Sequence, residues 1–116
     1  GLKGALQQIE ALKQRFWQRG KVVGSSDQLN QELERAGRVA DFIDFAALMC
    51  QDALSREESC GGHFREEYQE QGEAKRNDDA FSHVAAWRYE GEEREPTVHH
   101  EPLQFDEIHA QKRNYQ

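Results

Sequence analysis

The residues best suited to chemistry lie in the stretch SREESCGGHFREEY, residues 55–68, where Cys60 and His63 stand three positions apart. A thiol near an imidazole can be a nucleophile with its base, and it can also be half of a zinc site. A reactive cysteine needs a stabilised thiolate, commonly at a helix N-terminus or beside cations. A helical pattern leads into Cys60, so we expect this thiol at a helix C-terminus, where the dipole, Glu57 and Glu58 disfavour ionisation.

The two glycines that follow favour a structural interpretation of the same stretch. Gly61 and Gly62 can supply the left-handed conformation that ends many helices. His63 and Arg65 would then lie where cations complement the negative end of the helix dipole. The sequence therefore predicts a helix terminus here rather than a catalytic pair.

A zinc site is the alternative for the same cysteine and histidine. Structural zinc usually shows two closely spaced ligand pairs, and here Cys60 and His63 form only one. Further ligands would have to come from the remaining histidines, His83, His99, His100 or His109. His99 and His100 are adjacent, and adjacent residues on a strand point to opposite faces. We therefore predict no metal ligands, which an undisturbed fold after chelator treatment would support.

Other reactive patterns are equally weak. The paired glutamates at 57–58, 66–67 and 92–93 could hold an acid and a base, but nothing places two of them in an apolar pocket. The segment GKVVGSS, residues 20–26, lacks the preceding strand and the glycine spacing of a dinucleotide loop. The sequence thus predicts no catalytic, cofactor-binding or metal residue.

Two amphipathic helices precede this stretch. The first, at about 2–19, has apolar residues spaced three and four apart. They are Leu2, Ala5, Ile9, Leu12 and Phe16, with Leu6 and Trp17 widening the stripe. The second, at about 26–59, repeats the same spacing over nearly four heptads, after a cap within Ser25 to Asp27. Its stripe comprises Leu29, Leu33, Ala36, Ala40, Ile43, Ala47, Cys50 and Leu54, broadened by Val39, Phe42, Met49 and Ala53.

The short connection predicts that the two helices pack antiparallel. At 1.5 Å per residue the second helix would be about 45 Å long and the first only about 27 Å. One partner cannot cover the longer helix, and the first helix starts without a cap. We therefore expect a fragment in which at least one further helix preceded Gly1.

The period stops after Gly62, and residues 63–116 are predicted to form an irregular charged arm beside the helical portion 1–62. A polar loop covers 70–79, and Asn77 to Asp79 could cap a short helix at about 78–84. Two extended segments then predict a β-hairpin at about 84–105, with Pro96 and Pro102 confining its second arm to an edge.

Composition excludes several classes of protein. The chain has 116 residues, of which 36% are hydrophobic and 32% charged, with a net charge of −7. The core should be thin or shared, and a nucleic-acid partner is disfavoured because basic residues are dispersed among carboxylates. No apolar run approaches the roughly 20 residues that span a bilayer. Cys50 and Cys60 are expected to be free thiols, which suits a reducing compartment.

A family resemblance lies in two strings, LNQELERAGRVADFIDFAALMCQDALSREESCGGHFREEYQ (29–69) and GEAKRNDDAFSHVAAW (72–87). Together they resemble the C-terminal region of the flavoprotein subunit of succinate dehydrogenase and fumarate reductase. The most specific part is Glu58 to Arg65, which is similar to the family's Glu-Ser-Arg-Gly-Ala-His-x-Arg segment. Cys60 and Gly62, in place of the arginine and the alanine, resemble one branch of the family, in which Glu-Ser-Cys-Gly-Gly-His-Phe-Arg is usual. The paired Asp78-Asp79 and the ending Arg113-Asn114-Tyr115 are also similar to the family.

This resemblance implies the fold and the role of the chain. The fold would be mainly α, with antiparallel helices of a truncated three-helix, up-and-down, spectrin-repeat-like bundle and an irregular tail with a small hairpin. The parent protein would bind FAD, interconvert succinate and fumarate, and pass electrons to an iron-sulphur subunit. Its flavin and substrate residues lie in the two N-terminal domains of the family, so the isolated chain would be inactive and bind no cofactor.

The resemblance also implies partners and location. The FAD-binding and capping domains of the same subunit would contact the chain, with Glu58, Ser59, Cys60, His63 and Arg65 as the candidate interface. A missing helix would leave a groove that favours self-association. The location would be cytoplasmic and peripheral to the inner membrane through partner subunits, without direct insertion.

Two alternatives stay open at this point. The chain could be a stand-alone helical interaction module, or the C-terminal domain of a related flavin oxidase such as L-aspartate oxidase. The direction of the parent reaction and the quinone type cannot be inferred from these residues.

Overall fold

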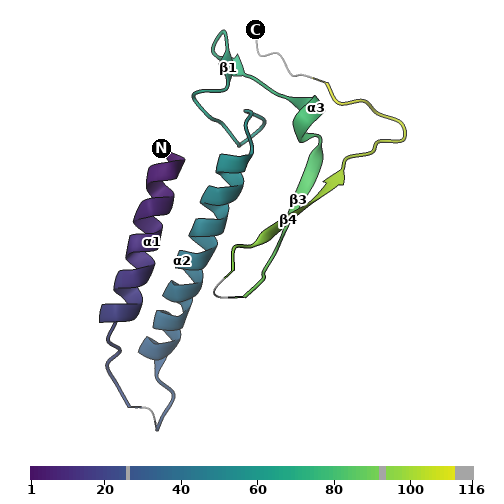
Figure 1. Cartoon of the computed structure of the whole chain (residues 1–116). Coiled ribbons are helices and arrows are strands. Elements are labelled where there is room, and N and C mark those ends of the chain that lie inside the picture. The colour runs from purple at the N-terminus through teal and green to yellow at the C-terminus, as the bar shows by residue number, and fades with distance from the viewer. Residues whose placement is uncertain (26, 92–93, 112–116) are drawn as a thin grey trace. The chain divides into compact units, whose positions relative to one another are not determined.

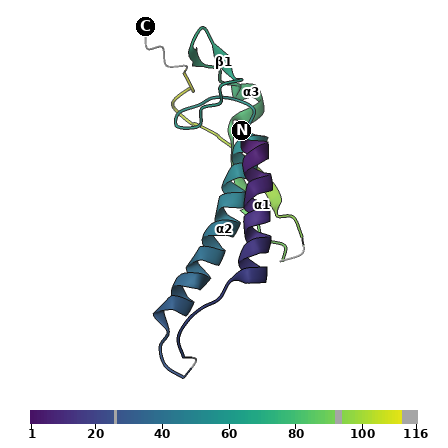
Figure 2. The same ribbon diagram turned by 90° about the vertical axis from the view of Figure 1, so that its left-hand side faces the viewer.

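The computed structural model describes residues 1–25, 27–91 and 94–111, which fall into two compact units, Gly1–Arg56 and Glu57–Gln116. The first unit is a pair of antiparallel helices, α1 (Leu2–Arg19) and α2 (Gln31–Ser55), which lie side by side in Figures 1 and 2. The second unit holds a four-residue helix and two small antiparallel sheets. The predicted class, mainly helical with a small hairpin in the tail, is therefore confirmed.

The helix α2 begins later than predicted because another residue caps it. The Asn30 side chain accepts hydrogen bonds from the backbone N–H groups of Glu32 (3.1 Å) and Leu33 (3.2 Å). Its amide also donates to the carbonyl oxygen of Val23 at 3.1 Å, which closes the connection. One side chain thus satisfies the helix start and fixes the loop, so the predicted start near residue 26 is wrong.

The helix pair has a thin core, as the composition predicted. Ile43 of α2 is the most enclosed apolar side chain in the described part of the chain, with 7% of its surface exposed. Leu12 and Trp17, which the periodicity placed in the stripe of α1, are exposed instead. Lys13 is half-buried and pairs with Asp44 across the two helices at 2.7 Å.

A second apolar row on α2 is not covered by α1. Val39, Phe42 and Met49 follow the helical spacing of three and seven residues, and each is exposed, Phe42 to 66%. Ile43 is the one residue of α2 that is buried in the described structure. The row of Val39, Phe42 and Met49 therefore stays exposed within the unit Gly1–Arg56.

The second unit begins with turns and ends with a hairpin. Strands β1 (Gln69–Glu70) and β2 (Glu73–Ala74) pair around Gln71 and Gly72, whose φ angles are 53° and 85°. Helix α3 (Asp78–Phe81) follows and is shorter than the predicted 78–84, because the next strand starts at His83.

Strands β3 (His83–Arg88) and β4 (Thr97–Pro102) pair antiparallel from His83 opposite Pro102 to Arg88 opposite Thr97. They form the hairpin that is seen in green and yellow-green in Figure 1. Both strands lie inside the predicted range, except that β3 starts one residue earlier. Of the predicted positions, Ser26, Glu92, Glu93 and residues 112–116 lie outside the described part of the chain.

Candidate functional site

The predicted reactive stretch lies outside any helix from Arg56 onward. The helix α2 ends at Ser55, where the N–H of Arg56 still donates to the carbonyl oxygen of Asp52 at 3.2 Å and Arg56 itself is extended. The expectation that Cys60 sits at a helix C-terminus is therefore wrong. The chain leaves the helix early because the backbone of Ser59 bonds elsewhere in the second unit, its N–H donating to the carbonyl oxygen of Lys75 at 2.9 Å.

Gly61 and Gly62 form a tight turn instead of a helix cap. Cys60 and His63 are joined by two backbone hydrogen bonds, of 2.8 Å and 3.1 Å, which make an isolated antiparallel bridge. Gly61 has a φ of 58° and Gly62 does not lie in the positive region. A positive φ at the first of two central residues is the pattern of a type II′ turn, which prefers glycine there.

Glu58 and Ser59 are the two most enclosed side chains of the described chain, with 1% and 0% of their surface exposed. The Glu58 carboxylate accepts a hydrogen bond from the backbone N–H of Asn77 at 2.8 Å. The Ser59 hydroxyl accepts from the N–H of Arg65 at 2.8 Å and donates to the carbonyl oxygen of the same residue at 3.1 Å. Both polar groups are thus used to fasten backbone segments together.

Charged side chains form ion pairs in the segments that Glu58 and Ser59 hold together. The Arg65 guanidinium pairs with Glu67 at 2.6 Å and lies over the ring of Tyr68, 4.8 Å from its centroid. A backbone hydrogen bond within Glu67, and next the Arg65 side chain, hold the pKa of the exposed Glu67 carboxyl below its ordinary value. Arg76 pairs with Asp78 through two hydrogen bonds of 2.9 Å, so α3 is tied to the segment before it.

The five residues predicted as an interface are brought into one region, although their side chains divide into two kinds. Glu58, Ser59 and Arg65 are directed into the second unit, whereas Cys60 and His63 flank the exposed turn. Sequence reasoning missed Lys75 and Asn77, which hold Ser59 and Glu58 through backbone groups. Backbone partners carry no side-chain signal, so no pattern in the sequence could have found them.

Three of the remaining histidines, His83, His99 and His100, lie on the hairpin, and His109 lies in the tail that follows it. His99 pairs with Ala86 and His100 with Ala85, so the two histidines occupy opposite faces of the sheet. His100 stacks on His83, with ring centroids 3.9 Å apart. In the described ranges no three His, Cys, Asp or Glu side chains gather where they could hold a metal ion.

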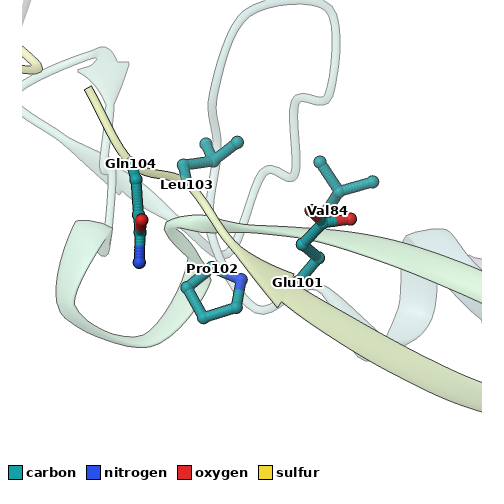
Figure 3. A pocket seen from close by; sticks show the side chains of 5 residues that line it. All are labelled: Val84, Glu101, Pro102, Leu103 and Gln104. Carbon is teal, nitrogen blue, oxygen red and sulfur yellow. The ribbon is translucent and has the colours of Figure 1, made fainter. Parts of the chain in front are cut away.

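Two hollows mark the surface of the units. One, of about 450 Å³, lies at the end of the β3–β4 hairpin, and Figure 3 shows its lining side chains, Val84, Glu101, Pro102, Leu103 and Gln104. The other, of about 270 Å³, is apolar and lies in the helix pair. Its lining residues are Phe16, Trp17, Gly20, Lys21, Val22, Leu33, Ala36, Gly37 and Ala40.

Neither hollow fits a flavin dinucleotide. A pyrophosphate needs backbone N–H groups at a glycine-rich helix start or cationic side chains. The hairpin hollow offers the acidic Glu101 and no cation, and the helical hollow offers Lys21 alone beside apolar groups. Neither of these two hollows therefore has the lining that an FAD site needs.

Over the described ranges no helix combines the length and the apolar character that a membrane span requires.

Comparison with known proteins identifies the chain. The family model described as the fumarate reductase flavoprotein C-terminus matches residues 1–115, and so covers both units. Neither the curated proteins nor the solved structures gave a match to this sequence. The family is a domain of flavoprotein oxidoreductases that form part of multi-subunit complexes, and nothing supports the stand-alone module or the aspartate oxidase alternative. The chain belongs to the C-terminal domain family of the succinate dehydrogenase and fumarate reductase flavoprotein.

Proposed function

We propose that this domain supports the FAD-dependent interconversion of succinate and fumarate and contributes no catalytic group to it. The observation that carries the proposal is the use of Glu58 and Ser59. They are the most enclosed acid and hydroxyl of the described chain, and their hydrogen bonds go to the backbone of Asn77 and Arg65. Groups that are fully engaged in fixing a fold are not free to exchange protons with a substrate.

The chemistry of the reaction belongs to the rest of the subunit in this proposal. FAD, when bound there, accepts or gives the hydride that converts one dicarboxylate into the other. The residues of this chain hold a rigid surface against the FAD-binding and capping domains and so help to position them. The direction of turnover depends on redox partners outside this chain.

Partners and location follow from the same proposal. The flavoprotein subunit would pass electrons to an iron-sulphur subunit, and the complex would lie at the cytoplasmic side of the inner membrane, attached through other subunits. The exposed row of Val39, Phe42 and Met49 supports a packing partner for α2. When the chain is isolated, a second copy would cover that row.

The test uses the intact flavoprotein subunit that carries this domain. Cys60→Ala and His63→Ala remove the two side chains that the sequence offered as a nucleophile and its base. We expect succinate or fumarate turnover within about twofold of the parent, because neither group takes part in the reaction. Loss of a positioned acid, base or nucleophile would cost about 10²-fold to 10⁴-fold instead.

Two matched substitutions control for the loss of a thiol or an imidazole as such. Cys50→Ala lies in α2, and His109→Ala lies in an exposed part of the tail. If Cys60→Ala or His63→Ala lowers turnover a hundredfold while the two controls do not, the domain contributes to catalysis and the proposal is wrong.

A further inference from the structure

The helical hollow of the first unit is lined by large aromatic side chains from one helix and mostly by small side chains from the other. Phe16 and Trp17 of α1 lie edge to face, with ring centroids 5.2 Å apart, and Trp17 is 68% exposed. The helix α2 contributes Ala36, Gly37 and Ala40 to the lining. A methyl group placed on Gly37 would meet no heavy atom within 4 Å beyond its neighbours in the helix. The two helices therefore leave a space of about 270 Å³ that neither of them fills.

The rim of the helical hollow is held in place by the connection between the helices. At the end of α1 the N–H of Gly20 donates to the carbonyl oxygen of Phe16 at 2.8 Å, and Lys21 follows in the lining. The Asn30 side-chain amide then ties the carbonyl oxygen of Val23 to the start of α2 at 3.1 Å. A hollow with a fixed rim is ready to bind, because a ligand need not order the loop when it enters.

Lys21 gives this apolar hollow one positive charge. It is the only charged side chain among the lining residues, and none of the ion pairs in the described structure uses it. Glu32 and Glu34, at the start of α2, pair with arginines of their own helix. The end of α1 and the start of α2 carry opposite partial charges, which largely cancel where both border the hollow. The chain has a net charge of −7, yet residues 1–25 hold five basic side chains and one acidic one. The hollow therefore favours an anion.

Volume, lining and charge together define the class of ligand. A space of about 270 Å³ lies just below the range of about 300 to 1,000 Å³ that is usual for ligand sites, so the ligand must be compact. An aromatic body suits the exposed ring of Trp17, because aromatic pairs gain more than the area that they bury. One carboxylate would meet the ammonium group of Lys21, whereas a second would find no cation in the lining. Succinate and fumarate are therefore poor ligands for this hollow, since each has two carboxylates and no large apolar body.

We propose that the helical hollow binds a compact aromatic monocarboxylate, with its rings against Trp17 and over Gly37 and its carboxylate at Lys21. This inference goes beyond the proposed function and does not depend on it, because every lining residue belongs to the unit Gly1–Arg56. Binding would leave the exposed row of α2 uncovered, because the residues of that row lie outside the lining.

Proton–nitrogen correlation NMR of the 116-residue chain tests the site, with β-naphthoate as the probe. We expect saturable shifts of the Trp17 indole N–H and the Gly37 amide, because both residues line the hollow. The Trp87 indole N–H, in the second unit, should not move. The neutral β-naphthamide has the same rings, and we expect its dissociation constant to be about threefold to fivefold higher, because an exposed ion pair contributes modestly.

Two variants test the volume and the charge separately. Gly37→Leu should fill the hollow and weaken the binding of β-naphthoate by about tenfold or more, while leucine favours the helix more than glycine does. Gly4→Leu is its control, because Gly4 also stands in a helix with open space beside it and lies outside the lining. Lys21→Gln should bind β-naphthoate and β-naphthamide equally, whereas Lys3→Gln, at an exposed lysine outside the lining, should keep their difference.

Four results would overturn the inference. If β-naphthoate shifts no signal, or shifts the Trp17 and Trp87 indoles equally, the hollow is not a specific site. If Gly37→Leu binds the probe as tightly as Gly4→Leu, the probe does not occupy the hollow. If β-naphthamide binds as tightly as β-naphthoate, the hollow does not select an anion. If the Trp17 and Gly37 signals of the unliganded chain move on dilution, a second copy of the chain occupies the hollow instead of a small ligand.

Discussion

Removing the Ser59 hydroxyl should destabilise the second unit far more than its size suggests. In Ser59→Ala the backbone N–H and carbonyl of Arg65 both lose the partner that the hydroxyl gave them, at 2.8 Å and 3.1 Å. An enclosed backbone group without a partner costs about 1 to 3 kcal/mol. Because two groups lose their partner and water can reach Arg65 in part, we expect a loss of about 2 to 3 kcal/mol in the free energy of unfolding.

Urea unfolding, followed by tryptophan fluorescence, measures this loss for each unit separately. Trp17 lies in the first unit and Trp87 in the second, so a Trp17→Phe background leaves Trp87 as the reporter of the second unit. With a slope of about 1 kcal/mol per molar urea for so small a unit, the midpoint should fall by about 2 to 3 M. The Trp87→Phe background should show an unchanged first unit.

Ser55→Ala is the matched control for this substitution. Its hydroxyl donates to the carbonyl oxygen of Asp52 at 2.8 Å, but the residue is exposed at the end of α2, so water can replace the bond. We expect it to cost less than about 0.5 kcal/mol. If Ser59→Ala costs no more than Ser55→Ala, the hydroxyl does not fasten the segment and the reasoning about the second unit is refuted.

Two further measurements probe the surface charge of the second unit and the open face of the first. The pKa of Glu67 is lowered in the fold, so its contribution to stability is present above the ordinary glutamate pKa of about 4.3 and is lost as pH falls through the lower folded value. Glu67→Gln should therefore lower the urea midpoint slightly at pH 6 and not at pH 3, and an equal difference at both pH values would contradict this sign. Phe42→Glu should convert self-associated chain to monomer in light scattering, because it places a charge in the exposed row of α2. Arg38→Glu, at an exposed position that pairs with Glu34, is the control for this substitution. A wild-type chain that is monomeric at all concentrations would contradict the proposal that a second copy covers this row.

The elements that depend on periodicity were predictable from the sequence. The first helix coincides with its predicted range, and the hairpin strands lie inside theirs apart from the one-residue earlier start of β3, since apolar spacing and turn residues are local signals. Both ends of α2 were misplaced for a different reason. Its start depends on Asn30 reaching across the loop to Val23, and its end depends on Ser59 bonding to Lys75, sixteen positions away.

The same distinction applies to the candidate site. Residue types alone suggested that Cys60 and His63 could react, and the prediction against a nucleophile assumed a helix that continues to Cys60. The helix ends at Ser55 and the cysteine lies beside a two-residue turn, so the helix dipole is not the reason why this thiol would be unreactive. Which side chains of the segment are free to meet another domain depends on burial, and burial depends on contacts that the spacing does not encode.

The first role of the segment from Glu58 to Arg65 is therefore to stabilise the second unit through hydrogen bonds. The segment can form an interface only when that unit is folded. Glu58 reaches Asn77 across nineteen positions and Ser59 reaches Lys75 across sixteen, so the two side-by-side residues hold the segment that leads into α3. A substitution at either position should first loosen that unit and only then weaken any contact that the unit makes with another domain. Effects on flavoprotein activity from Glu58 or Ser59 variants should accordingly follow the stability of the domain.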